Sequence, residues 1–319
     1  MIRKFSLTVT SLLGLAAATC FAAEKTYTFG VVAKSNNNPV FQAAKTGAED
    51  QAKKLSQNGV TVKIDWRTPN EEDPQKQADA IEQLVNAGAS GISVSASDAN
   101  KLTDAINKAV ESGVPVAMFD SDAPKSKRFV IFGTDDIDAG HTVMEELAKE
   151  MGGKGVVAIL AGNQNAPNLQ KRVQGVREEA KKYPDIKILD AFYHKETPQD
   201  AAAKVEQVMQ AHPEITGWAM IGGWPLFTDN ALKFAPGSVK VVAVDALPAQ
   251  LGYVKSGHVQ TLLAQQVYEW GSTTVDLLYD LVANNKKPEE AFVKGKLIPV
   301  TKDNVDEFAK NWEKWLPKK

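Results

Sequence analysis

The chain alternates short apolar runs with longer amphipathic stretches along almost its whole length, and this alternation constrains the fold more than any other feature. Strand-like runs at 27–33, 60–66, 91–95 and 114–119 are separated by stretches with apolar residues at helical spacing. The run 239–244 is almost continuously apolar, which is typical of a strand buried on both faces of a parallel sheet. The order predicts βαβ units in a doubly wound α/β architecture.

The alternation runs through two successive series, and the length of 319 residues accommodates both as separate domains. Each series spans roughly 110–130 residues, a common domain size. Among the helices of the second series, the pattern predicts one over 225–234. A strand near 297–300 and a helix over 305–315 are predicted to close the chain.

The first 23 residues predict a secretory signal peptide rather than a part of the fold. Arg3 and Lys4 form a basic start, residues 5–23 carry no charge, and Ala22 and Ala23 close the run. A membrane-spanning helix is the alternative, since about 20 apolar residues suffice for one. Several Ser and Thr residues dilute the run, so we expect cleavage near Ala22 or Ala23 and an exported protein.

The single cysteine, Cys20, lies within this segment. A lipoprotein, in which Cys20 becomes the acylated first residue and tethers the protein to a membrane, is an alternative. Ala17 and Thr19 match the cleavage box of lipoproteins poorly. Cleavage after Cys20 would leave a mature chain with no thiol, and hence with no disulfide and no thiolate metal site.

Composition and motifs exclude several classes of function. A formal net charge of −2 lacks the basic excess of a nucleic-acid binder. Neither nucleotide-binding fingerprint nor a G-x-S-x-G elbow occurs, and the four histidines lack metal-ligand spacing. We therefore predict no catalytic residue, no metal site and no cofactor. An exported hydrolase remains as an alternative, because Asp120 and Asp245 could serve as a pair of catalytic carboxylates.

Polar and aromatic residues follow several of the predicted strands. In open parallel sheets, ligands bind at the carboxyl ends of the strands. The polar positions are 34–38, 120–122, 163–165 and Asp245, and two tryptophans, Trp66 and Trp224, lie near further strand ends. The sequence therefore predicts a ligand site where these strand ends meet.

An ordered set of segments resembles the periplasmic sugar-binding proteins of the ribose-binding type. The segments are VVAKSNNNPVFQAAKTGAE at 31–49, GASGISVSASD at 88–98, SGVPVAMFDSD at 112–122, FGTDDIDAG at 132–140, NLQKRVQGV at 168–176, VVAVDALP at 241–248 and GHVQTLLAQQ at 257–266. They cover nearly the whole chain after residue 23. Any one segment is a weak signal, and the ordered set is a strong one.

The resemblance implies a type I periplasmic binding protein fold, with two Rossmann-like lobes joined by a three-strand hinge. The first lobe would comprise 24–134 and 266–293, and the second 135–265 and 294–319. Such a protein is a monomer in the periplasm that closes on its ligand like a hinge. It captures a simple sugar or sugar alcohol and delivers it to the inner-membrane permease of an ABC importer.

Residues that match the family motifs take over the family's binding roles. In the first lobe, Asn38 and Asp120 would hydrogen-bond sugar hydroxyls, and Phe41 would pack on the C–H face of the sugar. In the second lobe, Arg172 would donate to hydroxyl or ring oxygens, and Asp245 and Gln265 would complete the site. Asn168 lies one turn before Arg172 and would either support it or contact the ligand.

Departures from the family pattern put ribose itself in doubt. Val40 replaces a second aromatic residue, and Ser121 replaces an arginine. Gly222, Gly223 and Trp224 replace an Asn-Asp pair, and we infer that Trp224 supplies the lost stacking surface. Lys34 is unlike the ribose type and resembles fructose-type and autoinducer-2-type members, so a binding protein for autoinducer-2 is the main alternative.

Each site residue also has a plain structural interpretation. Asp120 and Asp245 could cap helices, Phe41 could belong to the core, and Arg172 and Lys34 could be solvated charges. Trp224 could merely pack the start of a helix. A transcription regulator shares the sensor fold, but it would need a DNA-binding segment where the signal peptide stands.

Overall fold

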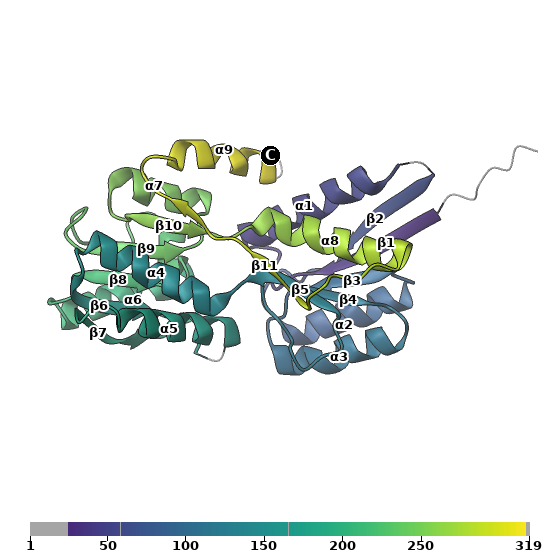
Figure 1. The fold of residues 1–319 in the computed structure, drawn as a ribbon, viewed down its shortest axis with the longest axis horizontal. Coiled ribbons are helices and arrows are strands. Elements are labelled where there is room, and N and C mark those ends of the chain that lie inside the picture. The colour runs from purple at the N-terminus through teal and green to yellow at the C-terminus, as the bar shows by residue number, and fades with distance from the viewer. Residues whose placement is uncertain (1–24, 58, 165, 317–319) are drawn as a thin grey trace, which may run out of the picture.

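The computed structural model of the chain describes residues 25–57, 59–164 and 166–316. These residues form two lobes that lie side by side, each built around one sheet (Figure 1). The predicted signal peptide and Cys20 lie outside the described residues. Within the described residues, none of the helices has the length and apolar character needed to cross a lipid bilayer.

The sheet of the first lobe is parallel throughout and has the order β11-β5-β4-β3-β1-β2. Its strands are β1 (Lys25–Val32), β2 (Val60–Trp66), β3 (Gly91–Val94), β4 (Val116–Phe119), β5 (Val130–Thr134) and β11 (Phe292–Gly295). One face is covered by α1 (Pro39–Leu55) and α8 (Val267–Asn284), the other by α2 (Pro74–Asn86) and α3 (Ala99–Glu111) (Figure 1).

The sheet of the second lobe has the order β12-β10-β9-β8-β6-β7, and only β12 runs antiparallel to its neighbour. Its strands are β6 (Lys154–Leu160), β7 (Asp185–Phe192), β8 (Gly217–Met220), β9 (Lys240–Val244), β10 (Thr261–Ala264) and β12 (Ile298–Val300). One face packs against α4 (Asp136–Glu150) and α5 (Pro167–Ala180). The other packs against α6 (Pro198–Ala211) and α7 (Pro248–Ser256).

The two sheets confirm the predicted doubly wound α/β fold. Both faces of each sheet are covered, which is why the strands are apolar rather than alternating. The chain passes between the lobes between β5 and α4, between β10 and α8, and between β11 and β12 (Figure 1). The carboxyl ends of the parallel strands of both sheets therefore lie close to these crossings.

Most of the helices begin at residues that favour a helix start, namely capping side chains and prolines. The side chains of Asp73, Asp98 and Asp135 accept hydrogen bonds from backbone amides at the starts of α2, α3 and α4. Proline occupies the first turn of α1, α2, α5, α6 and α7, where its missing N–H costs no helical bond. The strand-to-helix loops lie at the same edge of each sheet because the strands before them are parallel.

The predicted helix over 225–234 is wrong. Only a short 3₁₀ helix, η1 (Trp224–Phe227), forms there. The chain leaves the helical conformation at Thr228, whose backbone is extended, and Asn230 beyond it is left-handed with φ of 58°. The predicted strand and helix at the end of the chain are confirmed as β12 and α9 (Val305–Trp315), whereas β11 was not predicted.

Candidate functional site

A cleft between the lobes collects the predicted site residues. Its lining comes from both lobes, and sites for small molecules often lie at such a boundary between domains. All nine predicted residues line it: Lys34, Asn38, Phe41 and Asp120 from the first lobe, and Asn168, Arg172, Trp224, Asp245 and Gln265 from the second. Their roles in binding a ligand stay a prediction.

Asp120 follows β4 directly and has a left-handed backbone with φ of 56°. Aspartate is one of the few non-glycine residues that tolerate this conformation. Its Oδ2 accepts a hydrogen bond from Ser95 Oγ at 2.8 Å and lies 3.2 Å from Lys34 Nζ. Asp120 caps no helix, since Asp135 caps α4. Its carboxylate is therefore held in place by two neighbours of its own lobe.

Lys34 is buried in the cleft rather than solvated, with 14% of its side chain exposed. Burial alone would lower its pKa, but the carboxylates of Asp120, Glu72 and Glu196 raise it well above the usual value. Lys34 is therefore protonated throughout the physiological pH range. Its ammonium neutralises Asp120 and leaves further donor capacity for a ligand.

Arg172 is the centre of a hydrogen-bond network in the second lobe and is only 4% exposed. Its guanidinium donates from Nε to Asp136 Oδ1 at 2.9 Å, from Nη1 to the Ile221 carbonyl at 3.1 Å, and from Nη2 to Gln265 Oε1 at 3.0 Å. Burial would lower the pKa of Arg172, but the carboxylates of Asp136 and Asp245 raise it. The interpretation of Arg172 as a solvated charge is wrong.

The glycine of the R-x-x-G motif makes this network possible. A Cβ on Gly175 would collide with the Ile137 carbonyl, so only glycine lets α5 approach the start of α4 this closely. The close approach brings Arg172 on α5 to Asp136 on α4. Asp136 was not among the predicted residues, since it lies in the first turn of α4, where the helix dipole favours any carboxylate.

Gln265 connects the network across the crossings between the lobes. Its Oε1 accepts from Thr134 Oγ1 at 2.8 Å, and its Nε2 donates to Asp245 Oδ1 at 2.7 Å. Asp245 is partly buried and, like Asp120, adopts a left-handed backbone, with φ of 77°. Burial raises the pKa of Asp245, while Arg172 and the hydrogen bond from Gln265 lower it less strongly. Asp245 does not cap α7, whose N-cap residue is Leu247.

The aromatic lining of the first lobe is a small cluster. The Phe41 ring, which is 3% exposed, lies 6.4 Å from the Phe119 ring and 6.1 Å from the Trp270 ring, measured between centroids. Phe41 and Trp270 both reach the cleft. Phe41 is thus a core residue as well as a lining residue. Asn38 is the N-cap of α1, where its Oδ1 accepts from the Val40 amide at 3.1 Å.

Trp224 lies on two glycines of the second lobe. A Cβ on Gly162 or Gly222 would collide with the outer edge of its ring, so the Gly222-Gly223-Trp224 sequence makes room for the indole against the strand ends. The His194 ring packs edge-on against it with centroids 5.2 Å apart. Trp224 begins η1 and also lines the cleft, so both of its interpretations describe its position.

Three further observations complete the description of the cleft. Glu72 of the first lobe and Glu196 of the second both line the cleft, and burial raises the pKa of Glu196. Asn168 presents a buried Oδ1 with no hydrogen-bond partner among the described residues, which favours a ligand contact for it. No cluster of three or more His, Cys, Asp or Glu side chains in the described part of the chain could hold a metal ion.

The arrangement suits hydrogen bonding to a small polar molecule from two sides. Carboxylates of both lobes can accept, Lys34, Arg172 and Gln265 can donate, and aromatic rings offer apolar faces. Charge-assisted hydrogen bonds of this kind are about twice as strong as neutral ones. Side chains already fixed by neighbours need little further ordering when a ligand arrives.

Comparisons with known proteins agree with this geometry. A family model described as "Periplasmic binding protein domain" matches residues 29–287. The D-allose-binding periplasmic protein of Escherichia coli is 28% identical over 93% of this chain and 94% of its own length. The ribose import binding protein of Bacillus subtilis is 23% identical over 82% of this chain and 84% of its own length.

Solved structures show the same architecture. An ABC transporter solute-binding protein of Burkholderia graminis, in complex with D-arabinose, superposes with a TM-score of 0.80 at 28% identity, covering 89% of this chain and 98% of that one. An arabinose-binding protein of Geobacillus stearothermophilus gives a TM-score of 0.76 at 29% identity, covering 89% and 99%.

Proposed function

The chain belongs to the periplasmic binding protein family, and from this premise we propose that it captures a simple sugar or sugar alcohol between its two lobes. In this proposal it is the solute-binding subunit of an ABC importer and delivers the ligand, chemically unchanged, to a membrane permease. The observation that carries the proposal is that each lobe presents a group of polar side chains, already held by hydrogen bonds, to the same cleft. Lys34 and Asp120 face the cleft from one lobe, and Arg172, Asp245 and Gln265 face it from the other.

A polyhydroxyl ligand fits the chemistry of this lining. Each hydroxyl can donate to a carboxylate and accept from Lys34, Arg172 or Gln265, while Trp224 and Phe41 can pack on its C–H faces. Because the groups are buried, a ligand that lacks a matching hydroxyl leaves one of them unpaired, at a cost of about 1–3 kcal/mol. The site would therefore select strongly among related sugars.

The named relatives support the sugar class. Relatives at 28% identity or less include binding proteins for D-allose, ribose, D-apiose and xylitol. The structural match at 28% identity holds D-arabinose. No contact in the cleft and no relative named here favours autoinducer-2.

The lobe boundaries and the location of the protein are parts of the same proposal. We place 24–134 with 266–293 in the first lobe and 135–265 with 294–319 in the second. Residues 1–23 would be a cleaved signal peptide, and the mature protein would act as a monomer in the periplasm. The crossings between β5 and α4 and between β10 and α8 support the first two boundaries, whereas β11 of the first sheet extends to Gly295, two residues beyond the third.

A ligand screen tests the proposed function. The purified protein is titrated calorimetrically with D-ribose, D-arabinose, D-allose, D-apiose, xylitol and the autoinducer-2 precursor, and melting temperatures are measured in parallel. A true ligand at 100 times its Kd should stabilise the fold by about 2.7 kcal/mol. NMR of the recovered ligand should show it unchanged, and a simple glycoside incubated with the protein should also stay intact, whereas a hydrolase would cleave it. Absence of binding by every sugar and polyol at millimolar concentration would contradict the proposal.

A further inference from the structure

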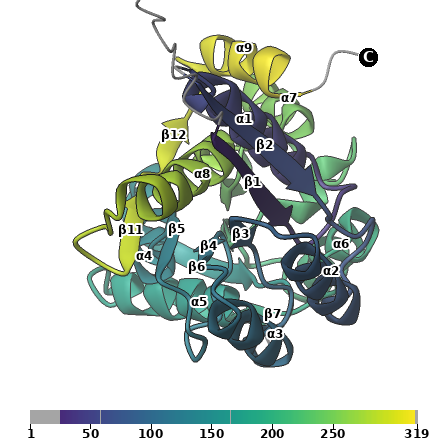
Figure 2. The same ribbon diagram turned by 90° about the vertical axis from the view of Figure 1, so that its right-hand side faces the viewer.

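The C-terminal helix α9 packs at the seam between the lobes and contacts both of them. It follows β12 of the second lobe, yet it packs against α7 of that lobe and against α1 of the first. Figure 1 shows α9 above the second lobe with its C-terminal end at the seam, and Figure 2 shows it beside both α1 and α7. The helix therefore touches both halves of the molecule that form the cleft.

Trp312 anchors α9 to residues 245–247 of the second lobe, which we call the binding loop. Its indole Nε1 donates to the Ala246 carbonyl at 2.7 Å, and the tryptophan is only 5% exposed. Ala246 directly follows Asp245, so this bond holds the peptide next to a residue of the proposed site. The same loop is fixed on either side, since the Asp245 amide donates to the Leu263 carbonyl and the Leu247 amide to Gln250.

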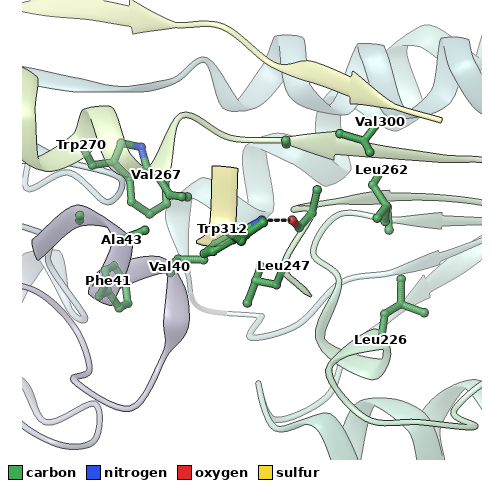
Figure 3. Packing of buried hydrophobic residues seen from close by; sticks show 14 of the residues in the cluster. Val40, Phe41, Ala43, Leu226, Leu247, Leu262, Val267, Trp270, Val300 and Trp312 are labelled. Atoms are coloured by element: carbon green, nitrogen blue, oxygen red, sulfur yellow. Dashed lines mark hydrogen bonds between the residues drawn. The ribbon is translucent and has the colours of Figure 1, made fainter. Parts of the chain in front are cut away.

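The other contacts of α9 reach the first lobe. Trp315 stacks on Tyr268 of α8 with ring centroids 6.0 Å apart, and its carbonyl accepts from Thr46 Oγ1 of α1 at 2.7 Å. Trp315 also packs edge-on against Trp312, with centroids 5.2 Å apart. In Figure 3, Trp312 lies between Val40 of the first lobe and Leu247 of the second.

We propose that Trp312 is a positioning residue of the binding site. It fixes the position of the loop that carries Asp245, while the helix to which Trp312 belongs also packs on the first lobe. The inference rests on the proposed sugar site, since Asp245 acts there. Asp245 needs such support because residues 245–247 belong to neither a helix nor a strand, so single hydrogen bonds hold their backbone in place. Because Trp315 contacts the first lobe and also packs on Trp312, a change in the relative position of the lobes would shift Trp312 and the loop that it holds.

Two variants test this role, one at the contact with the loop and one at the contact with the first lobe. Trp312→Phe keeps most of the ring but removes the N–H donor, and Trp315→Leu keeps that donor but removes the ring stacked on Tyr268. Amide hydrogen exchange of the peptide covering 245–248 is measured without sugar, and Kd is measured for the tightest binder among D-ribose, D-arabinose, D-allose, D-apiose and xylitol. Both variants should exchange faster there, and their affinity should fall about three- to tenfold, the range of one hydrogen bond.

Val305→Ala is the matched control, because Val305 is a buried residue of α9 that makes no hydrogen bond to the binding loop among the described residues. It should lower the melting temperature but leave sugar affinity and exchange at 245–248 unchanged. A double-mutant cycle of Trp312→Phe with Asp245→Asn should be non-additive, since both changes act on one contact to the sugar.

The outcomes separate this inference from the proposed function. If the wild-type protein binds a sugar and Trp312→Phe behaves like Val305→Ala, the positioning role is overturned and the function stands. If the wild-type protein binds none of the sugars, the proposed function fails. Exchange at 245–248 then decides the inference alone, and unchanged exchange in Trp312→Phe overturns it.

Discussion

Arg172 and Thr134 donate hydrogen bonds to the same atom, Oε1 of Gln265, at 3.0 and 2.8 Å. Thr134 ends β5 of the first lobe, and Arg172 belongs to α5 of the second. One amide oxygen at a crossing between the lobes therefore receives a donor from each of them. Because an amide oxygen has two lone pairs, both donors can be satisfied at once. The contact links the hinge to the side chains that face the ligand.

Replacing Arg172 should affect stability and binding separately. Arg172→Gln leaves Asp136, which is 12% exposed, without its ion-pair partner, and breaking a buried pair typically costs about 3–5 kcal/mol. Adding Asp136→Asn removes the unpaired charge and should restore most of the stability measured by urea denaturation. Sugar affinity should stay lost in the double variant, because the longer, charged guanidinium is still missing. Recovery of binding in the double variant would exclude a direct contact.

Asp120→Asn should weaken sugar binding with the fold retained. One oxygen of Asp120 is used by Ser95 and Lys34, so the other is available to accept from a ligand. Loss of a charge-assisted hydrogen bond costs about 1.5–3 kcal/mol, or roughly 10- to 150-fold in Kd measured by calorimetry. Asp104→Asn, on the exposed face of α3, is the control and should bind normally. Equal affinities would remove Asp120 from the site.

The stability of the sugar-free protein should depend on pH through Asp245. Burial raises the pKa of Asp245 above its ordinary value of 3.8, so the folded protein holds this proton to higher pH than the unfolded chain does. The stability contributed by this group is complete below the unfolded pKa and is lost as pH rises through the folded pKa. Asp245→Asn cannot ionise at this position, so it does not lose this contribution. The difference in melting temperature, variant minus wild type, should therefore increase from pH 4 to pH 8. Parallel curves for the two proteins would argue against the raised pKa.

Trp224→Ala should weaken sugar binding more than Trp224→Phe, because phenylalanine keeps part of the stacking surface. Aromatic contacts contribute about 0.5–1.5 kcal/mol beyond the area that they bury. Trp66→Phe is the matched control, since Trp66 lies near a strand end, donates to Asn36 Oδ1 and is not among the cleft-lining residues. Tryptophan fluorescence during titration should change on sugar binding in the control, and this change should shrink in both Trp224 variants. Unchanged Kd in Trp224→Ala would place the ligand elsewhere.

Two glycine-to-alanine substitutions should have opposite effects on stability. A Cβ on Gly175 collides with the Ile137 carbonyl and lies close to Gly140, so Gly175→Ala forces α5 away from α4 and moves Arg172 from Asp136. We expect lower stability and weaker sugar binding. Gly252 lies inside α7 with no neighbouring atom near its Cβ position, so Gly252→Ala should stabilise the fold by about 0.5–1 kcal/mol. Thermal denaturation of both variants checks the signs.

Much of the fold and the lining of the cleft could be predicted because both follow from local rules. Apolar runs marked the strands, and ligands lie at the carboxyl ends of parallel strands, so residues such as Asp120 and Asp245 could be found by position alone. The resemblance to a family added Arg172 and Gln265, which lie on a helix and at a crossing. Sequence spacing by itself does not distinguish these two positions from other polar residues.

What could not be predicted depends on contacts between distant parts of the chain. Asp136 has the pattern of a helix start, and only the close packing of α4 on α5 reveals its partner Arg172. Ser95 and Trp270 belong to apolar or amphipathic segments with no visible signal of a site. The helix over 305–315 showed a buried face, but amphipathicity identifies the face and not the surfaces that it covers.

The order in which the strands occur along the chain has a consequence for how the molecule is made. The sheet of the first lobe receives β11 and the sheet of the second receives β12 only at the end of synthesis. Helix α8, which covers the first sheet, also follows the strands of the second up to β10. A ribosome therefore completes nearly the whole polypeptide before either lobe can finish its sheet, and such long-range pairing is slow. Truncation of the chain before β11 would therefore remove an edge strand from both sheets at once.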